Sequence, residues 1–198
     1  MVIGTQLLRG ALASLMMAGV LTLSAPVRSD DAPVQPAGRQ KILDELFERL
    51  GKAQDDSEAR GIAGAIDRVW MRSGSDTADL LMNRAIQAIA TKDWGLSQEL
   101  LDKVVVLDPY WAEAWNKRAT ARFFADDYDG AMADLAKAVT LEPRHFGALT
   151  GMGFILQKSN LDKRALQVFR KALEFNPQQE EIRKIVDKLT LDVEGRPI

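Results

Sequence analysis

The sequence predicts an all-α protein: an α-solenoid of antiparallel helix pairs, made of three repeated units, a helix pair before them and a cap helix after them. Pro109, Pro143 and Pro177 stand 34 residues apart, and each follows an Asp, Glu or Asn residue. Between these prolines, apolar residues recur with the period of an α-helix. A fixed spacing of this kind is typical of stacked helix-turn-helix units, which bury their apolar faces only against their neighbours.

The N-terminal segment, residues 1–29, is expected to be a signal peptide that is cleaved after Ser29. It contains no Asp or Glu, and Arg9 precedes the apolar run 11–23. A membrane-spanning helix needs about 20 apolar residues, so this shorter run favours a secretory signal over an anchor. We therefore expect a periplasmic protein, secreted across the inner membrane, with no stable membrane insertion after cleavage. A mitochondrial transit peptide is the less favoured alternative, because such peptides are amphipathic.

A flexible leader and a helix pair are predicted next. Residues 30–38 contain two prolines and no apolar period, which is typical of a flexible leader. Residues 39–73 contain two stretches of helical period and form either a degenerate repeat or an N-terminal cap. The apolar face of the first stretch holds Ile42, Leu43, Leu46, Phe47 and Leu50, and that of the second holds Ile62, Ala63, Ile66, Val69 and Trp70. Ser73-Gly74-Ser75 then interrupts the pattern, and Asp76 is expected to cap the following helix.

Three repeated units, 78–111, 112–145 and 146–179, come into register when each proline is set at position 32. Small residues recur at positions 8, 20 and 27, where the two antiparallel helices of a unit must approach closely. They are Ala85, Ala119 and Gly153, then Ser97, Ala131 and Ala165, then Val104, Ala138 and Ala172. Position 24 is bulky and holds Leu101, Leu135 and Phe169. This pattern resembles the tetratricopeptide repeat (TPR), and the chain is similar to small bacterial periplasmic TPR adaptor proteins.

Three arginines depart from the TPR pattern, which prefers large apolar residues at their positions. For Arg84, Arg118 and Arg122, we expect the aliphatic stems to cover apolar surface while the charged heads reach water. After the repeats, residues 180–191 are predicted to form a C-terminal cap helix, because the last unit of a solenoid would otherwise expose an apolar face. The tail after Leu191 is expected to be loose.

Composition and motifs argue against catalysis and cofactor binding. The net charge of −2 offers no basic footprint, so nucleic acid is not an expected partner. His145 is the single histidine and there is no cysteine, which argues against a zinc site. Asp126–Gly130 lacks the first and last ligands of a calcium loop, and Gly151–Gly153 lies inside a predicted helix rather than after a strand. We expect no metal, no cofactor and no catalytic residue, with an unrecognised enzyme as a remote alternative.

The resemblance implies a binding function, because the first helix of each TPR unit lines a concave groove. The residues expected to line it for a partner are Met82, Ile86, Ile89, Asn116, Thr120, Phe123, Phe124, Phe154, Gln157 and Lys158. A clamp for a C-terminal carboxylate is disfavoured, since Asp79, Met82 and Glu113 occupy positions that such a clamp needs. The phenylalanines instead favour an apolar segment or an amphipathic helix of a partner protein, with Asn116 available for main-chain contacts.

Two alternatives to an open binding groove remain. Phenylalanines at helical spacing are often core residues, and the N-terminal helix pair could fold over the groove and fill it. Self-association through an exposed apolar face would make the protein a structural subunit of an envelope complex. The favoured hypothesis is an exported scaffold or adaptor that binds a protein or peptide partner, and a homo-oligomer is possible.

Overall fold

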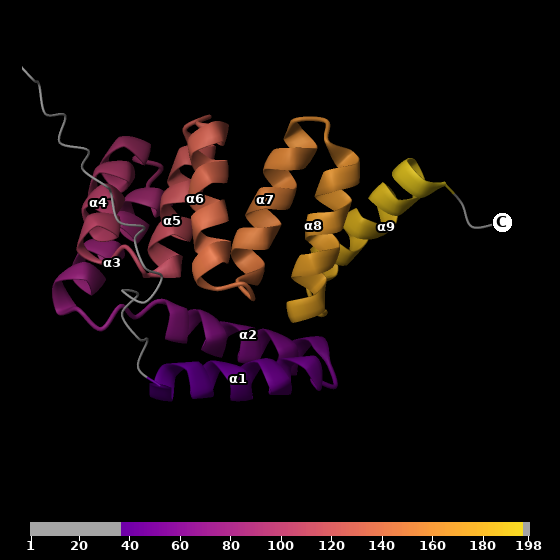
Figure 1. Cartoon of the computed structure of the whole chain (residues 1–198), viewed down its shortest axis with the longest axis horizontal. Coiled ribbons are helices and arrows are strands. Elements are labelled where there is room, and N and C mark those ends of the chain that lie inside the picture. Colours follow the sequence, from indigo (N-terminus) through magenta and orange to yellow (C-terminus); the bar gives the residue numbers. More distant parts are fainter. Residues whose placement is uncertain (1–36, 196–198) are drawn as a thin grey trace, which may run out of the picture. The chain divides into compact units, whose positions relative to one another are not determined.

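The structure is a computed structural model that describes residues 37–195; the predicted signal peptide and most of the predicted leader lie outside the described residues. This part of the chain forms nine α-helices and no strand (Figure 1). They are α1 (Ala37–Gly51), α2 (Asp56–Trp70), α3 (Asp76–Ala90), α4 (Trp94–Leu107), α5 (Ala112–Phe124), α6 (Tyr128–Leu141), α7 (Phe146–Lys158), α8 (Asp162–Phe175) and α9 (Glu180–Glu194). The predicted all-α fold is confirmed. None of these helices is long and apolar enough to cross a membrane.

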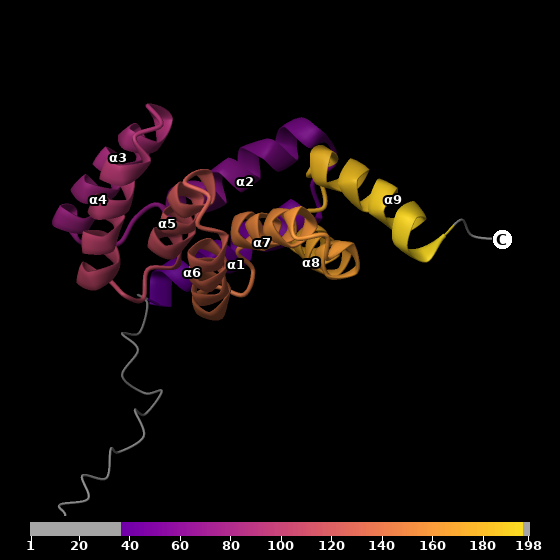
Figure 2. The ribbon, with the colours of Figure 1, turned by 90° about the horizontal axis from the view of Figure 1, so that it is seen from above.

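Helices α3 to α8 form three hairpins, and each helix packs on the next along the chain, as Figures 1 and 2 show. The small residues at positions 8, 20 and 27 of each unit are all buried. Gly153 illustrates why they must be small, because a Cβ atom there would lie 2.4 Å from the ring of Phe169 on α8. The repeat period therefore reports the close approach of two helices, and the predicted solenoid of three units is confirmed.

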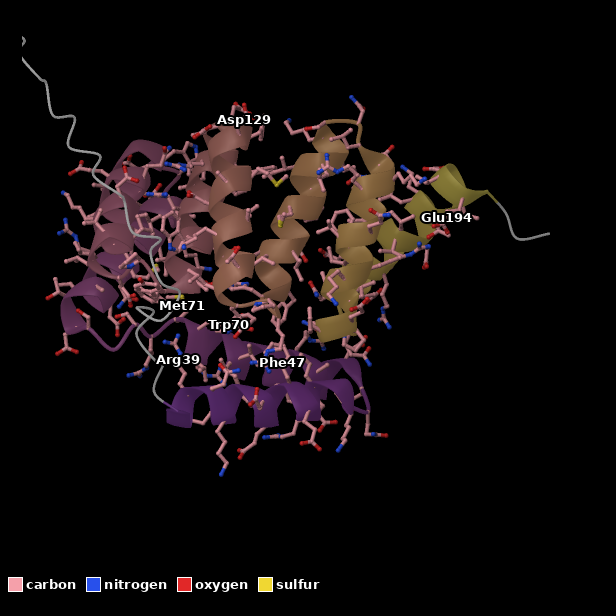
Figure 3. All side chains as sticks on the ribbon, viewed as in Figure 1. Arg39, Phe47, Trp70, Met71, Asp129 and Glu194 are labelled. Atoms are coloured by element: carbon pink, nitrogen blue, oxygen red, sulfur yellow. The ribbon has the colours of Figure 1, made fainter. Side chains whose placement is uncertain are left out.

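The N-terminal pair, α1 and α2, does not extend the stack as a further repeat. It runs crosswise to the repeat helices, along one end of them (Figure 1). The indole Nε1 of Trp111, which precedes α5, donates a hydrogen bond to the carbonyl oxygen of Trp70 (2.6 Å). Trp70, labelled in Figure 3, stacks its ring on His145, which precedes α7, with centroids 4.1 Å apart. Phe47 reaches Phe175 at the end of α8. The pair thus covers an edge to which all three units contribute.

Several helix ends differ from the sequence-based expectations. Helix α1 begins at Ala37, inside the predicted leader, and Ile42 is exposed instead of lying on the buried face of that helix. The N-cap of α3 is Ser75 rather than Asp76, since the Ser75 side chain accepts a hydrogen bond from the N–H of Ala78. Helix α9 continues past Leu191 to Glu194, and Val193 in its last turn packs on a core that α9 shares with α8.

The expectation that the arginine heads reach water is wrong for two of the three arginines. Arg118 contacts the buried carboxylate of Asp134 on α6 through two nitrogens, at 2.8 and 2.7 Å. Arg122 contacts the same carboxylate at 2.9 Å. Arg84 is exposed, as expected. Helices α5 and α6 are therefore joined by an ion network, which accounts for arginine at positions where the TPR pattern prefers apolar residues.

Candidate functional site

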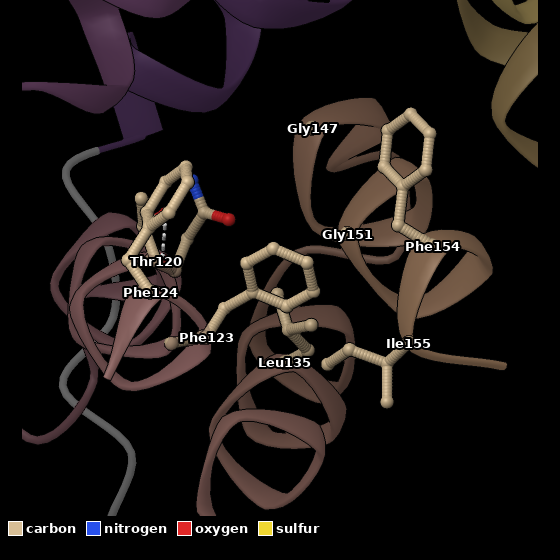
Figure 4. Close-up of a pocket in the computed structure, with 10 residues that line it drawn as sticks. Thr120, Phe123, Phe124, Leu135, Gly147, Gly151, Phe154 and Ile155 are labelled. Atoms are coloured by element: carbon tan, nitrogen blue, oxygen red, sulfur yellow. Dashed lines mark hydrogen bonds between the residues drawn. The ribbon is translucent and has the colours of Figure 1, made fainter. Parts of the chain in front are cut away.

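A cavity of about 180 Å³ opens between α5 and α7, the first helices of units two and three (Figure 4). We call it the α5–α7 cavity. Its lining residues are Asn116, Ala119, Thr120, Phe123, Phe124, Leu135, Gly147, Gly151, Phe154 and Ile155. Five of the residues predicted for the groove are among them, namely Asn116, Thr120, Phe123, Phe124 and Phe154. The lining is almost entirely apolar.

Two glycines on α7 leave the cavity open. Gly147 and Gly151 are one helical turn apart and both line it. The equivalent positions of unit two, 34 residues earlier, hold Glu113 and Lys117. Sequence reasoning missed the role of these glycines. The signal that could have revealed it is a pair of glycines, four residues apart, on the groove face of a predicted helix where the other repeats carry side chains.

Exposed aromatic rings flank the cavity. Figure 4 shows Phe123 and Phe124 on one side of it and Phe154 on the other. Phe124 is 55% exposed and Phe154 is 39% exposed. The ring of Phe124 stacks on Trp94 of α4 with centroids 5.0 Å apart, and Phe154 packs edge-on against Phe169. Packing therefore holds these rings in place while each keeps a face toward solvent.

A buried polar cluster lies beside the cavity and centres on Glu113. The Glu113 carboxylate contacts His145 Nε2 at 2.8 Å, Asn116 Nδ2 at 3.1 Å and Lys117 Nζ at 2.8 Å. Burial alone would raise the pKa of Glu113, but the hydrogen bond from His145 and the charge of Lys117 outweigh burial and lower that pKa to about 2. Glu113 is therefore a carboxylate at neutral pH. Glu113 occupies a position that a carboxylate clamp would need, and its side chain is buried.

The histidine of this cluster is a helix cap. His145 Nδ1 accepts a hydrogen bond from the N–H of Ala148 in the first turn of α7 (3.2 Å). Nδ1 must therefore carry no hydrogen, so the hydrogen is on Nε2, which donates a hydrogen bond to the Glu113 carboxylate. Because the side chain is 2% exposed and covered by Trp70, it has no access to a substrate. Within residues 37–195, no cluster of His, Asp or Glu side chains could hold a metal ion.

The same cluster fixes the orientation of the Asn116 amide. A carboxylate can only accept hydrogen bonds, so Asn116 must present Nδ2 to Glu113 and turn Oδ1 away from it. Asn116 also lines the cavity. In the described part of the chain, its side-chain oxygen Oδ1 accepts no hydrogen bond from another residue.

The remaining predicted groove residues lie outside the α5–α7 cavity. Met82 is fully buried in the core of unit one, so it offers no surface to a partner. Ile86 and Ile89 pack on that same core. Gln157 is half-buried, and Lys158 lies over the ring of Tyr128, 5.0 Å from its centroid. The open surface therefore comes from units two and three.

A second, more polar cavity of about 460 Å³ adjoins the first and shares Phe154 with it. Its walls come from α2, α7 and the start of α9, and they include Arg60, Thr150, Gln179 and Glu181. Helix α2 borders this second cavity and contributes no residue to the first. In the described part of the chain, the N-terminal helix pair thus leaves the α5–α7 cavity open.

Comparisons with known proteins agree with this architecture. The family model described as tetratricopeptide repeat matches residues 125–189. A TPR repeat-containing protein of Rhizobium etli is 38% identical over 151 residues, which cover 74% of this chain and 74% of that protein. The first TPR domain of Spaghetti, solved with an HSP90 peptide, aligns with a TM-score of 0.58 and 20% identity over 61% of this chain and 95% of that one. The translocator chaperone SycD of Yersinia enterocolitica aligns with a TM-score of 0.58 and 15% identity over 61% of this chain and 96% of that one.

Proposed function

The chain belongs to the tetratricopeptide repeat family, and from this premise we propose that it is a non-catalytic scaffold that binds a segment of a partner protein in the α5–α7 cavity. The observation that carries the proposal is the open apolar cavity flanked by the exposed rings of Phe124 and Phe154. Apolar pockets with rigid aromatic walls are where binding energy concentrates in protein interfaces. The polar groups nearby are engaged in capping and pairing, which supports binding over chemistry.

The partner segment is proposed to be apolar, and not an acidic C-terminus of the kind carried by the HSP90 peptide on the Spaghetti domain. Asp79 already accepts hydrogen bonds from Ser73, and Glu113 holds a negative charge beside the cavity. The Glu113 charge is balanced by Lys117, and no residue that lines the cavity offers a positive charge to a second carboxylate. The side-chain oxygen Oδ1 of Asn116 can accept a hydrogen bond from a main-chain N–H of the bound segment.

We also propose that the protein works in the bacterial envelope after export. The support is the acid-free N-terminus with its apolar run, residues 1–29. Fractionation of cells, followed by N-terminal sequencing of the mature protein, tests the location and the cleavage site. A protein that keeps residues 1–29 in the cytoplasm would contradict this part of the proposal.

The binding proposal is tested by crosslinking in cells with a matched pair of surface variants. Phe124→Glu places a charge beside the cavity, whereas Val106→Glu places one on α4, where Val106 is 80% exposed. We expect one defined envelope protein to be captured by the native chain and by Val106→Glu, and at least a tenfold lower yield with Phe124→Glu. Equal yields of the captured protein from both variants, with unchanged helical circular dichroism, would contradict the proposal.

Self-association is the second candidate, favoured by an exposed apolar face on the first repeat. Val106 and Leu107 are 80% and 55% exposed and border a shallow depression with Leu81. Two copies could bury this face against each other. Light scattering separates the candidates, because self-association gives a doubled mass that Val106→Glu abolishes and Phe124→Glu leaves unchanged.

A further inference from the structure

The size of the α5–α7 cavity limits what it can hold. Its volume is about 180 Å³. An apolar cavity of about 150 Å³ holds one benzene ring, so this one has room for a single large side chain and not for a helix. A partner segment would therefore lie over the opening and insert one residue.

The charge of the lining selects a neutral occupant. None of the ten lining residues carries an ionisable side chain. The two polar side chains are Asn116, whose amide is oriented by Glu113, and Thr120, whose hydroxyl donates to the Asn116 carbonyl of the main chain at 3.0 Å. A charged side chain inserted here would lose its hydration without gaining a counter-charge, which is costly.

The aromatic walls favour a ring. Phe123, Phe124 and Phe154 present edges and faces around the opening (Figure 4), and aromatic pairs gain energy beyond their buried area in edge-on and offset arrangements. These rings are held by contacts with Trp94, Tyr128 and Phe169, so little ordering is needed when a partner ring enters.

Gly147 is the residue that keeps this space free. A Cβ atom at position 147 would lie 3.6 Å from the His145 ring and 4.0 Å from Asn116 Nδ2, which are ordinary contacts. Alanine is thus accommodated without strain, and a longer side chain would extend into the cavity. At Gly151 the corresponding distance to Leu135 is only 3.2 Å, so substitution there would also disturb the packing of α6.

We propose that the α5–α7 cavity is a specificity pocket for one neutral, preferably aromatic, side chain of an extended partner segment, and that Gly147 determines this specificity. The inference rests on the proposed function, since it specifies which kind of partner side chain the binding site accepts. The adjoining polar cavity, which shares Phe154, receives the polar residues next to the anchor along the segment.

The test is a selection of random 12-residue peptides displayed on phage against the immobilised protein, followed by titration calorimetry of the enriched peptides. We expect the peptides to share one Phe, Trp, Tyr or large aliphatic position. Replacing that residue with Lys should weaken binding at least about tenfold, because a buried side chain of this size contributes that much to affinity. Gly147→Leu should weaken binding by a similar factor, and Gly147→Ala by less.

Two controls separate this inference from the proposed function. Both substitutions remove a glycine from a helix, so thermal unfolding should show folded proteins that are at least as stable as the native chain. If the peptides lose binding with Phe124→Glu but tolerate Lys at every apolar position and bind Gly147→Leu normally, the site stands and the anchor pocket is refuted. If the selection yields no peptide that is sensitive to Phe124→Glu or Gly147→Leu, both the site and the pocket are refuted.

Discussion

Glu113 couples the stability of the fold to pH, because three donors hold its carboxylate in a buried position. Its pKa is about 2 in the folded state against an ordinary value of 4.5. The folded state thus favours the charged form, so the contribution is fully present above about pH 4.5 and is lost as the pH falls toward 2. The difference corresponds to a stability contribution on the order of 3 kcal/mol.

Urea unfolding of the native chain and of Glu113→Gln, at several pH values between 6 and 2.5, measures this contribution. The native chain should lose stability more steeply than the variant as the pH falls below 4.5. The other carboxylates titrate in both proteins, so apart from Asp67, whose pKa the Glu113 charge raises, their contributions cancel in the difference between the two curves. Parallel curves would mean that the carboxylate is not specifically stabilised.

Contacts between individual polar side chains were the feature of the fold that the sequence predicted least well. The sequence argues against His145 as a zinc ligand because it is the single histidine, but it gives no sign of the bond to Glu113, which joins residues 32 positions apart. The contact between Arg118 and Asp134 spans 16 positions and depends on how two helices are rotated against each other. A pattern of small and bulky residues specifies that helices approach; it does not specify which polar side chains then meet.

The turns inside the three hairpins share one backbone feature, a residue with a positive φ angle at the same position of each unit. Lys92, Asp126 and Asn160 stand 34 residues apart and have φ angles of 61°, 62° and 57°. Asn and Asp tolerate this left-handed conformation, whereas lysine does so at a cost. Lys92→Gly should therefore stabilise the protein by about 0.5–1 kcal/mol.

Thermal unfolding of Lys92→Gly checks this expectation, and Asn160→Gly is the matched control at the same position of the third unit. The control should change stability by only a few tenths of a kcal/mol, because Asn already suits the conformation. A Lys92→Gly variant that is no more stable than Asn160→Gly would show that the turn at Lys92 is not strained.

Among the helices, those of the repeats could be predicted from the sequence, whereas the path of α1 and α2 could not. Periodicity located all six repeat helices because each unit repeats the same contacts. The N-terminal pair makes different contacts, such as Trp70 with His145 and Phe47 with Phe175. These contacts do not recur along the chain, so no repeated sequence pattern predicts them. Helix α9 ran longer than expected for a similar reason, since Val193 in its last turn packs on a core shared with α8 that lies outside the repeat pattern.

For the molecule as a whole, the sequence located half of the candidate site. The groove positions of units two and three surround one cavity, because α5 and α7 face each other across Leu135. Unit one contributes nothing to that cavity, and Met82 is buried in its core. The cavity itself was not predicted, because the sequence analysis followed the side chains that are present and did not weigh the space that Gly147 and Gly151 leave on the groove face.

The α1–α2 pair should make the described solenoid unfold as a single unit. Repeat arrays normally gain stability from neighbour contacts alone, so units can unfold one after another. Here Trp70 contacts both Trp111 and His145, and Phe47 reaches Phe175, so one helix pair joins the ends of all three units. Truncating the buried ring with Trp70→Ala should cost about 3–5 kcal/mol.

Such a truncation should also reduce the cooperativity of unfolding, and a core truncation in one unit should not. Leu101→Ala, at a fully buried position of α4, is the matched control and should lower the urea midpoint with little change in the slope m. Trp70→Ala should lower both the midpoint and m, because the released units then unfold over separate ranges of urea. If circular dichroism gives the same m for the two variants, each unit is coupled through its neighbours alone and the pair serves only to cover the edge of the stack.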